Sequence, residues 1–172
     1  PHTLARYAAT DGITFTDSIV LPYLAPDVVT ALKVVAAKAG SVEVVSSFRT
    51  VAQQYLIHAW WSSGRCGITQ AARPGRSNHE GGRALDLSNY EGALKDLTAA
   101  GFANDVVGDA PHFAFDAAPD ARGLDVMAFQ RLWNRNNPED LIDEDGEYGS
   151  QTGERLAKSP AQGFTIGACG TK

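Results

Sequence analysis

The most informative stretch of this sequence is Ser77-Asn78-His79-Glu80-Gly81-Gly82-Arg83-Ala84-Leu85-Asp86. It places a histidine and an aspartate on either side of a Gly-Gly turn, and the alternation after the turn predicts a strand over residues 83–88. An imidazole and a carboxylate at the two ends of so short a loop can converge on one ion. The stretch therefore predicts part of a metal site, the alternative being a β-turn with a capped aspartate.

A third metal ligand is expected elsewhere in the chain, because a catalytic zinc ion usually has three protein ligands and a water. The sequence holds four histidines. His2 lies near the terminus, and His58 falls in the middle of an expected helix beside two tryptophans, which favours a packing or surface role. His112 remains, at the start of a short expected strand. We therefore predict that His79, Asp86 and His112 bind Zn²⁺, a set with an open position that favours this ion.

Asp109 lies three positions before His112, across a tight turn that contains Pro111. A water activated by zinc needs a base that takes its proton and passes it to the leaving amine. A carboxylate at this spacing can face the water rather than the metal, as a glutamate does in metallopeptidases that have two histidine ligands. Asp109 is therefore a candidate for this base.

The hydrophobic periodicity predicts a mixture of helices and strands without βαβ regularity, so the expected fold class is α+β, with a small antiparallel sheet flanked by helices. Gly40, Gly64 and Gly101 are expected to end helices. Helices are expected over 26–39, 50–63, 91–100, 126–134 and 152–157, and strands over 42–48, 83–88 and 112–115. An irregular loop is expected over 67–78, and a linker rich in Ala, Pro and Asp over 117–123.

Composition excludes several classes of partner. The net charge is −5 and no block of Lys or Arg is present, so neither a nucleic acid nor an anionic membrane is expected as a partner. The apolar runs are shorter than the ~18–20 residues that span a bilayer, so no membrane span is expected. We also expect a monomer. Because the chain starts at Pro1, we expect that a preceding segment was removed by a signal peptidase or by truncation.

The two cysteines, Cys66 and Cys169, are far apart, and neither belongs to a CxxC pair. A cysteine-based zinc site is therefore not expected. We favour a disulfide between them, because Cys169 lies in a tail of small residues with little reason to hold a core side chain. Two unpaired, half-buried thiols are the alternative. A disulfide would fit an extracytoplasmic compartment.

These motifs resemble those of the D-alanyl-D-alanine carboxypeptidase/VanY family of zinc peptidases, which includes phage endolysins that cut the L-Ala-D-Glu bond. The family pattern is SxHxxGxAxD, followed by an acidic residue three positions before a final histidine. Its counterparts here are Ser77, His79, Gly82, Ala84, Asp86, Asp109 and His112. A second match is Ser47-Phe48-Arg49-Thr50, which ends an expected strand and precedes a helix with two glutamines, Gln53 and Gln54. The resemblance covers roughly residues 41–115.

The resemblance implies a hedgehog/DD-peptidase-like fold and a secreted or cell-wall peptidase that cleaves peptidoglycan peptides. It implies that the three ligands hold Zn²⁺ and that Asp109 is the general base and then the acid. Arg49 would contact the scissile carbonyl or a substrate carboxylate, and Ser77 would hydrogen-bond the substrate. The alternatives are a surface ion pair for Arg49 and a loop cap for Ser77.

Two residues depart from the pattern of the carboxypeptidase members, which have Glu as the base and Trp directly before the final histidine. Here Asp109 and Pro111 take these places, as in endolysin-type endopeptidases. The bond that is cut therefore stays open between the terminal D-Ala-D-Ala bond and L-Ala-D-Glu.

The C-terminal segment resembles a small peptidoglycan-binding module found beside cell-wall hydrolases. The resemblance rests on residues 126–134, the turn at 145–149 and Thr152. We therefore expect a zinc peptidase domain over 1–117 and a peptidoglycan-binding-like helical segment over 123–172. The alternative function for the whole chain is a zinc-containing cell-wall-binding protein without activity.

Overall fold

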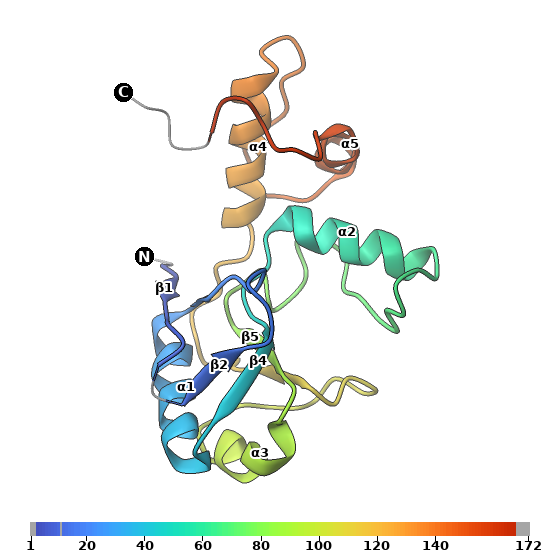
Figure 1. Ribbon diagram of the computed structural model, residues 1–172. Coiled ribbons are helices and arrows are strands. Elements are labelled where there is room, and N and C mark those ends of the chain that lie inside the picture. Colours follow the sequence, from blue (N-terminus) through green and yellow to red (C-terminus); the bar gives the residue numbers. More distant parts are fainter. Residues whose placement is uncertain (1–2, 11, 168–172) are drawn as a thin grey trace. The chain divides into compact units, whose positions relative to one another are not determined.

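The computed structural model describes residues 3–10 and 12–167, which form two compact units (Figure 1). The first unit comprises residues 1–49 and 78–121, and the second comprises residues 50–77 and 122–172. Residues 50–77 thus pack with the C-terminal segment, although they precede the expected linker. The functional assignment of the two expected domains stays a prediction.

The first unit is built on a four-stranded sheet in the order β2-β4-β5-β6. These strands are β2 (Ile13–Phe15), β4 (Val42–Ser46), β5 (Ala84–Leu87) and β6 (His112–Ala114). β4, β5 and β6 pair antiparallel, and β2 adds to β4 in parallel, so the sheet is mixed. The α+β class is confirmed. The sequence prediction omitted β2 and the small two-stranded sheet of β1 (Ala5–Arg6) and β3 (Tyr23–Leu24) because these strands are too short to show alternation.

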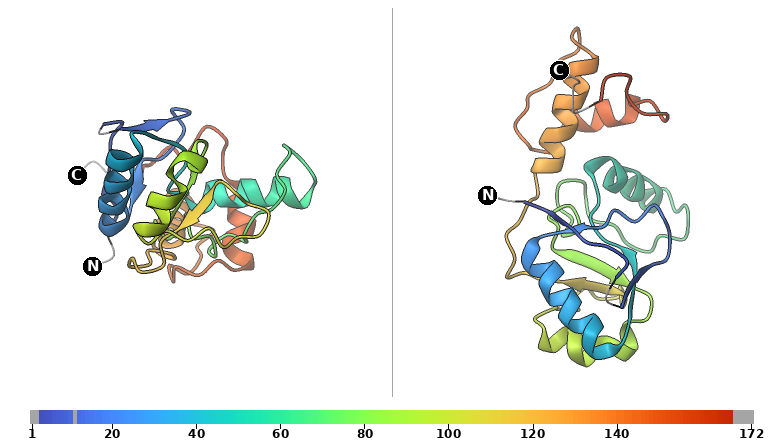
Figure 2. Two further views of the ribbon diagram at one scale, coloured as in Figure 1. Left: turned by 90° about the horizontal axis from the view of Figure 1, so that it is seen from below. Right: turned by 60° about the vertical axis from the view of Figure 1, so that its left-hand side comes forward.

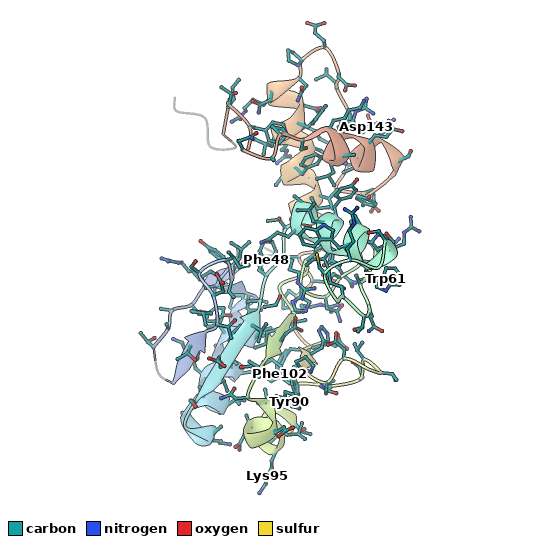
Figure 3. All side chains as sticks on the ribbon, turned by 45° about the vertical axis from the view of Figure 1, so that its right-hand side comes forward. Phe48, Trp61, Tyr90, Lys95, Phe102 and Asp143 are labelled. Carbon is teal, nitrogen blue, oxygen red and sulfur yellow. The ribbon has the colours of Figure 1, made fainter. Side chains whose placement is uncertain are left out.

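Two helices pack on the sheet, α1 (Pro26–Ala39) and α3 (Tyr90–Ala99), both close to their expected bounds. They lie side by side (Figure 2), and each contacts β4. Every second residue of a strand points to the same face of the sheet. On the face toward α1 and α3, strand residues such as Val44, Leu85 and Phe113 pack with the helices in one buried core. Figure 3 shows Tyr90 and Phe102 at the α3 end of the sheet, whereas Lys95 points outward from α3. The face of the sheet that points away from α1 and α3 carries other side chains, among them Asp86 and His112.

The second unit is helical and has its own core. It contains α2 (Val51–Ser62), α4 (Leu124–Asn136) and α5 (Ser150–Lys158). Thr50 caps the start of α2: its hydroxyl accepts a hydrogen bond from Gln53 N, and the side-chain oxygen of Gln53 accepts one from Thr50 N. Val51 of α2 is buried with Phe129 and Trp133 of α4 and with Leu156 of α5. This shared core explains why α2 belongs to the second unit.

The C-terminal turn is fixed by the buried amide of Gln130. Its Nε2 donates to Asp145 Oδ1 at 2.8 Å and to the carbonyl of Glu147 at 3.2 Å, and its Oε1 accepts from Gly146 N at 2.9 Å. Gln130 Nε2 also lies 3.2 Å from Thr152 Oγ1. The three parts of the sequence that carry the resemblance, residues 126–134, the turn at 145–149 and Thr152, are therefore joined by hydrogen bonds.

The structure also bears on the expected disulfide and on the length of the apolar helices. Cys66 is exposed, but Cys169 lies outside the described residues, so the disulfide stays a prediction. Within residues 3–10 and 12–167, no helix has the length and apolar character needed to cross a bilayer.

Candidate metal centre

A β-bulge in β4 creates the first half of the site. Val44 pairs with Leu87, but Ser46 pairs with Asp86, so β4 has one extra residue between the two pairs. Regular alternation would place Ser46 on the core face with Val44, and the bulge instead turns it to the opposite face. Because Asp86 also pairs with His112 across β5 and β6, these three residues form a row on the face opposite α1 and α3.

His79 reaches this row from the turn at residues 78–82, which is tied to the end of β4. Its Nδ1 lies 2.8 Å from the carbonyl oxygen of Ser47, and Arg49 N donates to the carbonyl of His79 at 3.4 Å. A carbonyl only accepts, so Nδ1 bears the proton and Nε2 offers its lone pair. The turn is held on its other side by Ala25 N, which donates to the carbonyl of Gly82 at 2.8 Å.

Three ligand atoms converge where the row and the turn meet. His79 Nε2 lies 3.2 Å from His112 Nδ1, His112 Nδ1 lies 3.1 Å from Asp86 Oδ1, and His79 Nε2 lies 3.3 Å from the same oxygen. Ligands at the Zn–N and Zn–O distances of a tetrahedral site are about 3.3 Å apart. Within the described part of the chain, this is the one group of three or more His, Cys, Asp or Glu residues found close enough together to hold a metal ion.

The chemistry of this donor set fits a divalent cation. The two imidazoles are buried and Asp86 is half-buried, so three electron-pair donors face one another with little access to water. Such an arrangement is costly unless a proton or a cation lies among them. Residues far apart in sequence have thus been brought to one point, and the triad predicted from the sequence is present as a geometric unit.

Arg49 is part of this centre through Asp86. Its Nη2 donates to Asp86 Oδ2 at 2.7 Å, and its Nε donates to Ser46 Oγ at 3.0 Å. The carboxylate therefore presents Oδ1 to the imidazoles and Oδ2 to the guanidinium, which fixes its orientation. Both side chains are mostly buried, so this is not the surface ion pair that the sequence left open.

Two more carboxylates act on Arg49. Burial lowers the pKa of its guanidinium, and the negative charges of Asp86, Asp109 and Glu80 oppose that change. Asp109 is half-buried. It lies in a turn in which its main-chain N donates to the carbonyl of Val106, and its main-chain carbonyl accepts from His112 N at 3.1 Å. The three carboxylates exceed the one guanidinium by two formal charges, a balance that a divalent ion would neutralise.

Glu80 is a site residue that the sequence reasoning did not single out. It is fully buried in the turn beside His79 and interacts electrostatically with Arg49. Charged residues are almost never fully buried without a partner. The available signal was its position between a ligand and the Gly-Gly pair, but a glutamate in a turn is ordinarily exposed, so burial could not be foreseen.

The protonation states of His79 and Asp86 suit metal binding. Burial lowers the pKa of His79, and the nearby Arg49 charge lowers it further. Burial would raise the pKa of Asp86, but its interactions with His79, His112 and Arg49 outweigh burial and hold it well below the usual range. Near neutral pH the site therefore offers a neutral imidazole and a carboxylate, the forms that bind metals.

The remaining candidates are placed differently. Ser77 is buried at the end of the loop that belongs to the second unit. Its expected hydrogen bond to a substrate stays a prediction. The ring of His58 lies 5.4 Å from that of Trp61 on α2, in agreement with the packing or surface role expected from the sequence. His2 lies outside the described residues.

Two imidazoles and a carboxylate that converge on one point resemble the three-ligand sets of metal-dependent hydrolases. The comparison with known families agrees: the model of the family VanY, D-alanyl-D-alanine carboxypeptidase, matches residues 21–118, more than half of the chain. The chain belongs to this family, and at family level it is a peptidase that acts on peptidoglycan. A search of curated proteins finds no match.

Proposed function

We propose that this protein is a zinc-dependent peptidase that hydrolyses peptide bonds in the stem peptides of peptidoglycan, outside the cytoplasm. The observation that carries the proposal is the convergence of His79 Nε2, His112 Nδ1 and Asp86 Oδ1 within 3.1–3.3 Å of one another. The family match supports the substrate class, since members are described as D-alanyl-D-alanine carboxypeptidases.

The triad would hold the zinc ion. When bound, zinc would supply a Lewis acid that polarises the scissile carbonyl and lowers the pKa of a coordinated water. The protein's part is to keep its ligands in the right form and orientation. Ser47 does so for His79, and Arg49 does so for Asp86.

Asp109 is the proposed general base. Its carboxylate is half-buried and close enough to Arg49 to influence the guanidinium. In the proposed reaction it takes the proton of the attacking water and then gives it to the nitrogen of the leaving amine, so that the peptide bond breaks to an acid and an amine. A positioned base of this kind contributes about 10²–10⁴-fold to rate.

Arg49 has a proposed second role beside its ion pair with Asp86. A guanidinium next to the metal ligands can stabilise negative charge on the carbonyl oxygen as water adds to it, or can bind a substrate carboxylate. The buried position strengthens either interaction, because less water screens the charge.

The bond that is cut is proposed to be one between alanine and its neighbour in the stem peptide. The two candidates are D-Ala-D-Ala and L-Ala-D-Glu. Asp109 and Pro111, in place of Glu and Trp, favour the endopeptidase over the carboxypeptidase.

The test is mass spectrometry of a defined muropeptide digested by the zinc-loaded protein, with an EDTA-treated control. Loss of one terminal alanine identifies a DD-carboxypeptidase, and release of a fragment that begins at D-Glu identifies an L-Ala-D-Glu endopeptidase. Activity that is insensitive to EDTA and unaffected by Asp109→Asn would contradict the proposed mechanism. Zinc binding without any cleavage would favour the non-catalytic wall-binding protein.

The second unit is proposed to help hold the cell wall, on the resemblance of its C-terminal segment to a peptidoglycan-binding module. Truncation at Ala117 is a poor test, because it removes the partners of Val51 in the second core. Point substitutions of exposed residues in the intact chain, assayed by sedimentation with purified peptidoglycan, keep that core. Unchanged binding by all of them would contradict a role of this unit in wall attachment.

A further inference from the structure

We propose that Tyr7 and Ser47 form a positioning pair that orients His79 as a metal ligand, so that the N-terminal segment is part of the metal centre. This inference rests on the proposed metal site and adds to it Tyr7 and the side chain of Ser47, whose main-chain carbonyl already contacts His79. Tyr7 also lies outside residues 21–118, the region that the family model matches.

The contact chain runs from the phenol to the imidazole. Tyr7 Oη donates to Ser47 Oγ at 2.9 Å, and Ser47 Oγ donates to the carbonyl of Tyr23 at 3.2 Å. The backbone carbonyl of the same serine accepts from His79 Nδ1 at 2.8 Å. The serine side chain is thus held at two points, and its peptide carbonyl is aimed at the ligand ring.

This chain is shielded from water along its length. The relative exposures are 4% for Tyr7, 1% for Ser47 and 2% for His79. Hydrogen bonds in such surroundings are costly to leave unmade, because the separated groups cannot turn to solvent. Burial raises the pKa of Tyr7 to about 12, with the hydrogen bond to Ser47 opposing the rise, so the phenol stays a donor at neutral pH.

The N-terminal segment holds Tyr7 in place by its own contacts. Tyr7 N donates to the carbonyl of Pro22 at 3.0 Å, next to the β1–β3 pairing, and its ring lies 5.4 Å from that of Phe15. The same segment packs on the ligand turn, since a Cβ added at Gly82 would lie 2.3 Å from Leu4 Cδ2. The N-terminal segment therefore contacts the turn of His79 through Leu4, and it reaches the imidazole indirectly through Tyr7 and Ser47.

The chemical consequence concerns the tautomer and tilt of His79. A carbonyl fixed opposite Nδ1 keeps the proton there and leaves Nε2 for the metal, and such second-layer partners typically change metal affinity 10–100-fold when removed. Ser47 contributes its main-chain carbonyl, which substitution cannot delete. Its position depends on the side-chain bonds, and those are what Tyr7 and Ser47 supply.

The test compares Tyr7→Phe, Ser47→Ala and the double variant with the wild type. Zinc affinity is measured by competition with a chromophoric chelator, and the ligand geometry by the visible absorption of the Co²⁺-loaded protein. Tyr90→Phe is the matched control, since it removes a phenol hydroxyl elsewhere in the same unit, on a ring that packs against Phe113. Urea unfolding of the metal-free proteins reports stability separately.

We expect Tyr7→Phe to weaken zinc binding about tenfold and to shift the Co²⁺ spectrum, with Tyr90→Phe unchanged. The double variant is expected to match Ser47→Ala, because the two side chains act as one unit. Wild-type affinity and spectrum in Tyr7→Phe, or a loss confined to metal-free stability, overturn the inference alone. Absence of zinc binding by the wild-type protein overturns the proposed function and this inference with it.

Discussion

Nη2 of Arg49 lies 2.7 Å from Oδ2 of Asp86, while Oδ1 of the same carboxylate faces His79 and His112. One carboxylate therefore joins the guanidinium to the ligand cluster. The structure makes Arg49 a neighbour of the proposed metal ligands, in addition to the proposed contact with a substrate.

Arg49→Lys tests this relationship. Lysine keeps the charge but cannot donate from a rigid fork to both Ser46 Oγ and Asp86 Oδ2. We expect zinc affinity to fall about tenfold and turnover to fall further, as measured by chelator competition and by muropeptide cleavage. Equal zinc affinity in variant and wild type would show that the ion pair does not orient Asp86.

Asp109→Asn separates metal binding from proton transfer. Asparagine has nearly the same shape but cannot take a proton, so we expect kcat to fall about 10²–10⁴-fold while zinc remains bound. Asp105→Asn is the control, since Asp105 is an exposed aspartate of the same loop. A similar small effect of both substitutions on kcat would remove Asp109 from the mechanism.

His112→Ala tests the ligand set through stability rather than activity. A ligand that binds only the folded state stabilises it by about 2.7 kcal/mol when its concentration is 100-fold above Kd. We expect zinc to raise the melting temperature of the wild type and to leave His112→Ala unchanged. His58→Ala, on α2, is expected to keep the zinc response. A full zinc shift in His112→Ala would contradict the proposed triad.

Gly82→Ala tests the turn of the candidate metal centre, and Gly92→Ala is the comparison. Gly82 has φ of +67°, and a Cβ there would lie 2.3 Å from Leu4 Cδ2 and 3.3 Å from Ala25 N. We expect a loss of about 1–3 kcal/mol in the free energy of unfolding, with weaker zinc binding. Gly92 lies in α3 with open space around the added methyl, so its substitution is expected to stabilise by about 0.5–1 kcal/mol.

Alkaline unfolding tests the burial of Tyr7, whose pKa rises from 10.0 to about 12 in the folded state. The unfolded chain loses the phenol proton first, so the stabilisation is complete below pH 10 and is lost as pH rises to about 12. This difference corresponds to about 2–3 kcal/mol at most. Tyr7→Phe is expected to flatten the decline of the free energy of unfolding over this window. An equally steep decline in the variant would contradict the burial of a titrating phenol.

The sequence by itself determined the parts of this protein that depend on local patterns. The helices expected over 26–39 and 50–63 depend on patterns that extend over a few residues, and the structure has α1 and α2 at these positions. The cap of α2 by Thr50 is equally local. The family motifs also contain the three residues of the proposed ligand set, because the spacing within each motif is a local property of its segment.

Only the tertiary structure decided what depends on pairing between distant segments. The bulge in β4 places Ser46 opposite Asp86, and burial of Glu80 and the contact of Tyr7 with Ser47 follow from packing that no local period encodes. The two-unit division has the same origin, because α2 buries Val51 with helices from the end of the chain rather than with its sequence neighbours. Hydrophobic burial and strand register act between residues that are close in space, whatever their separation along the chain.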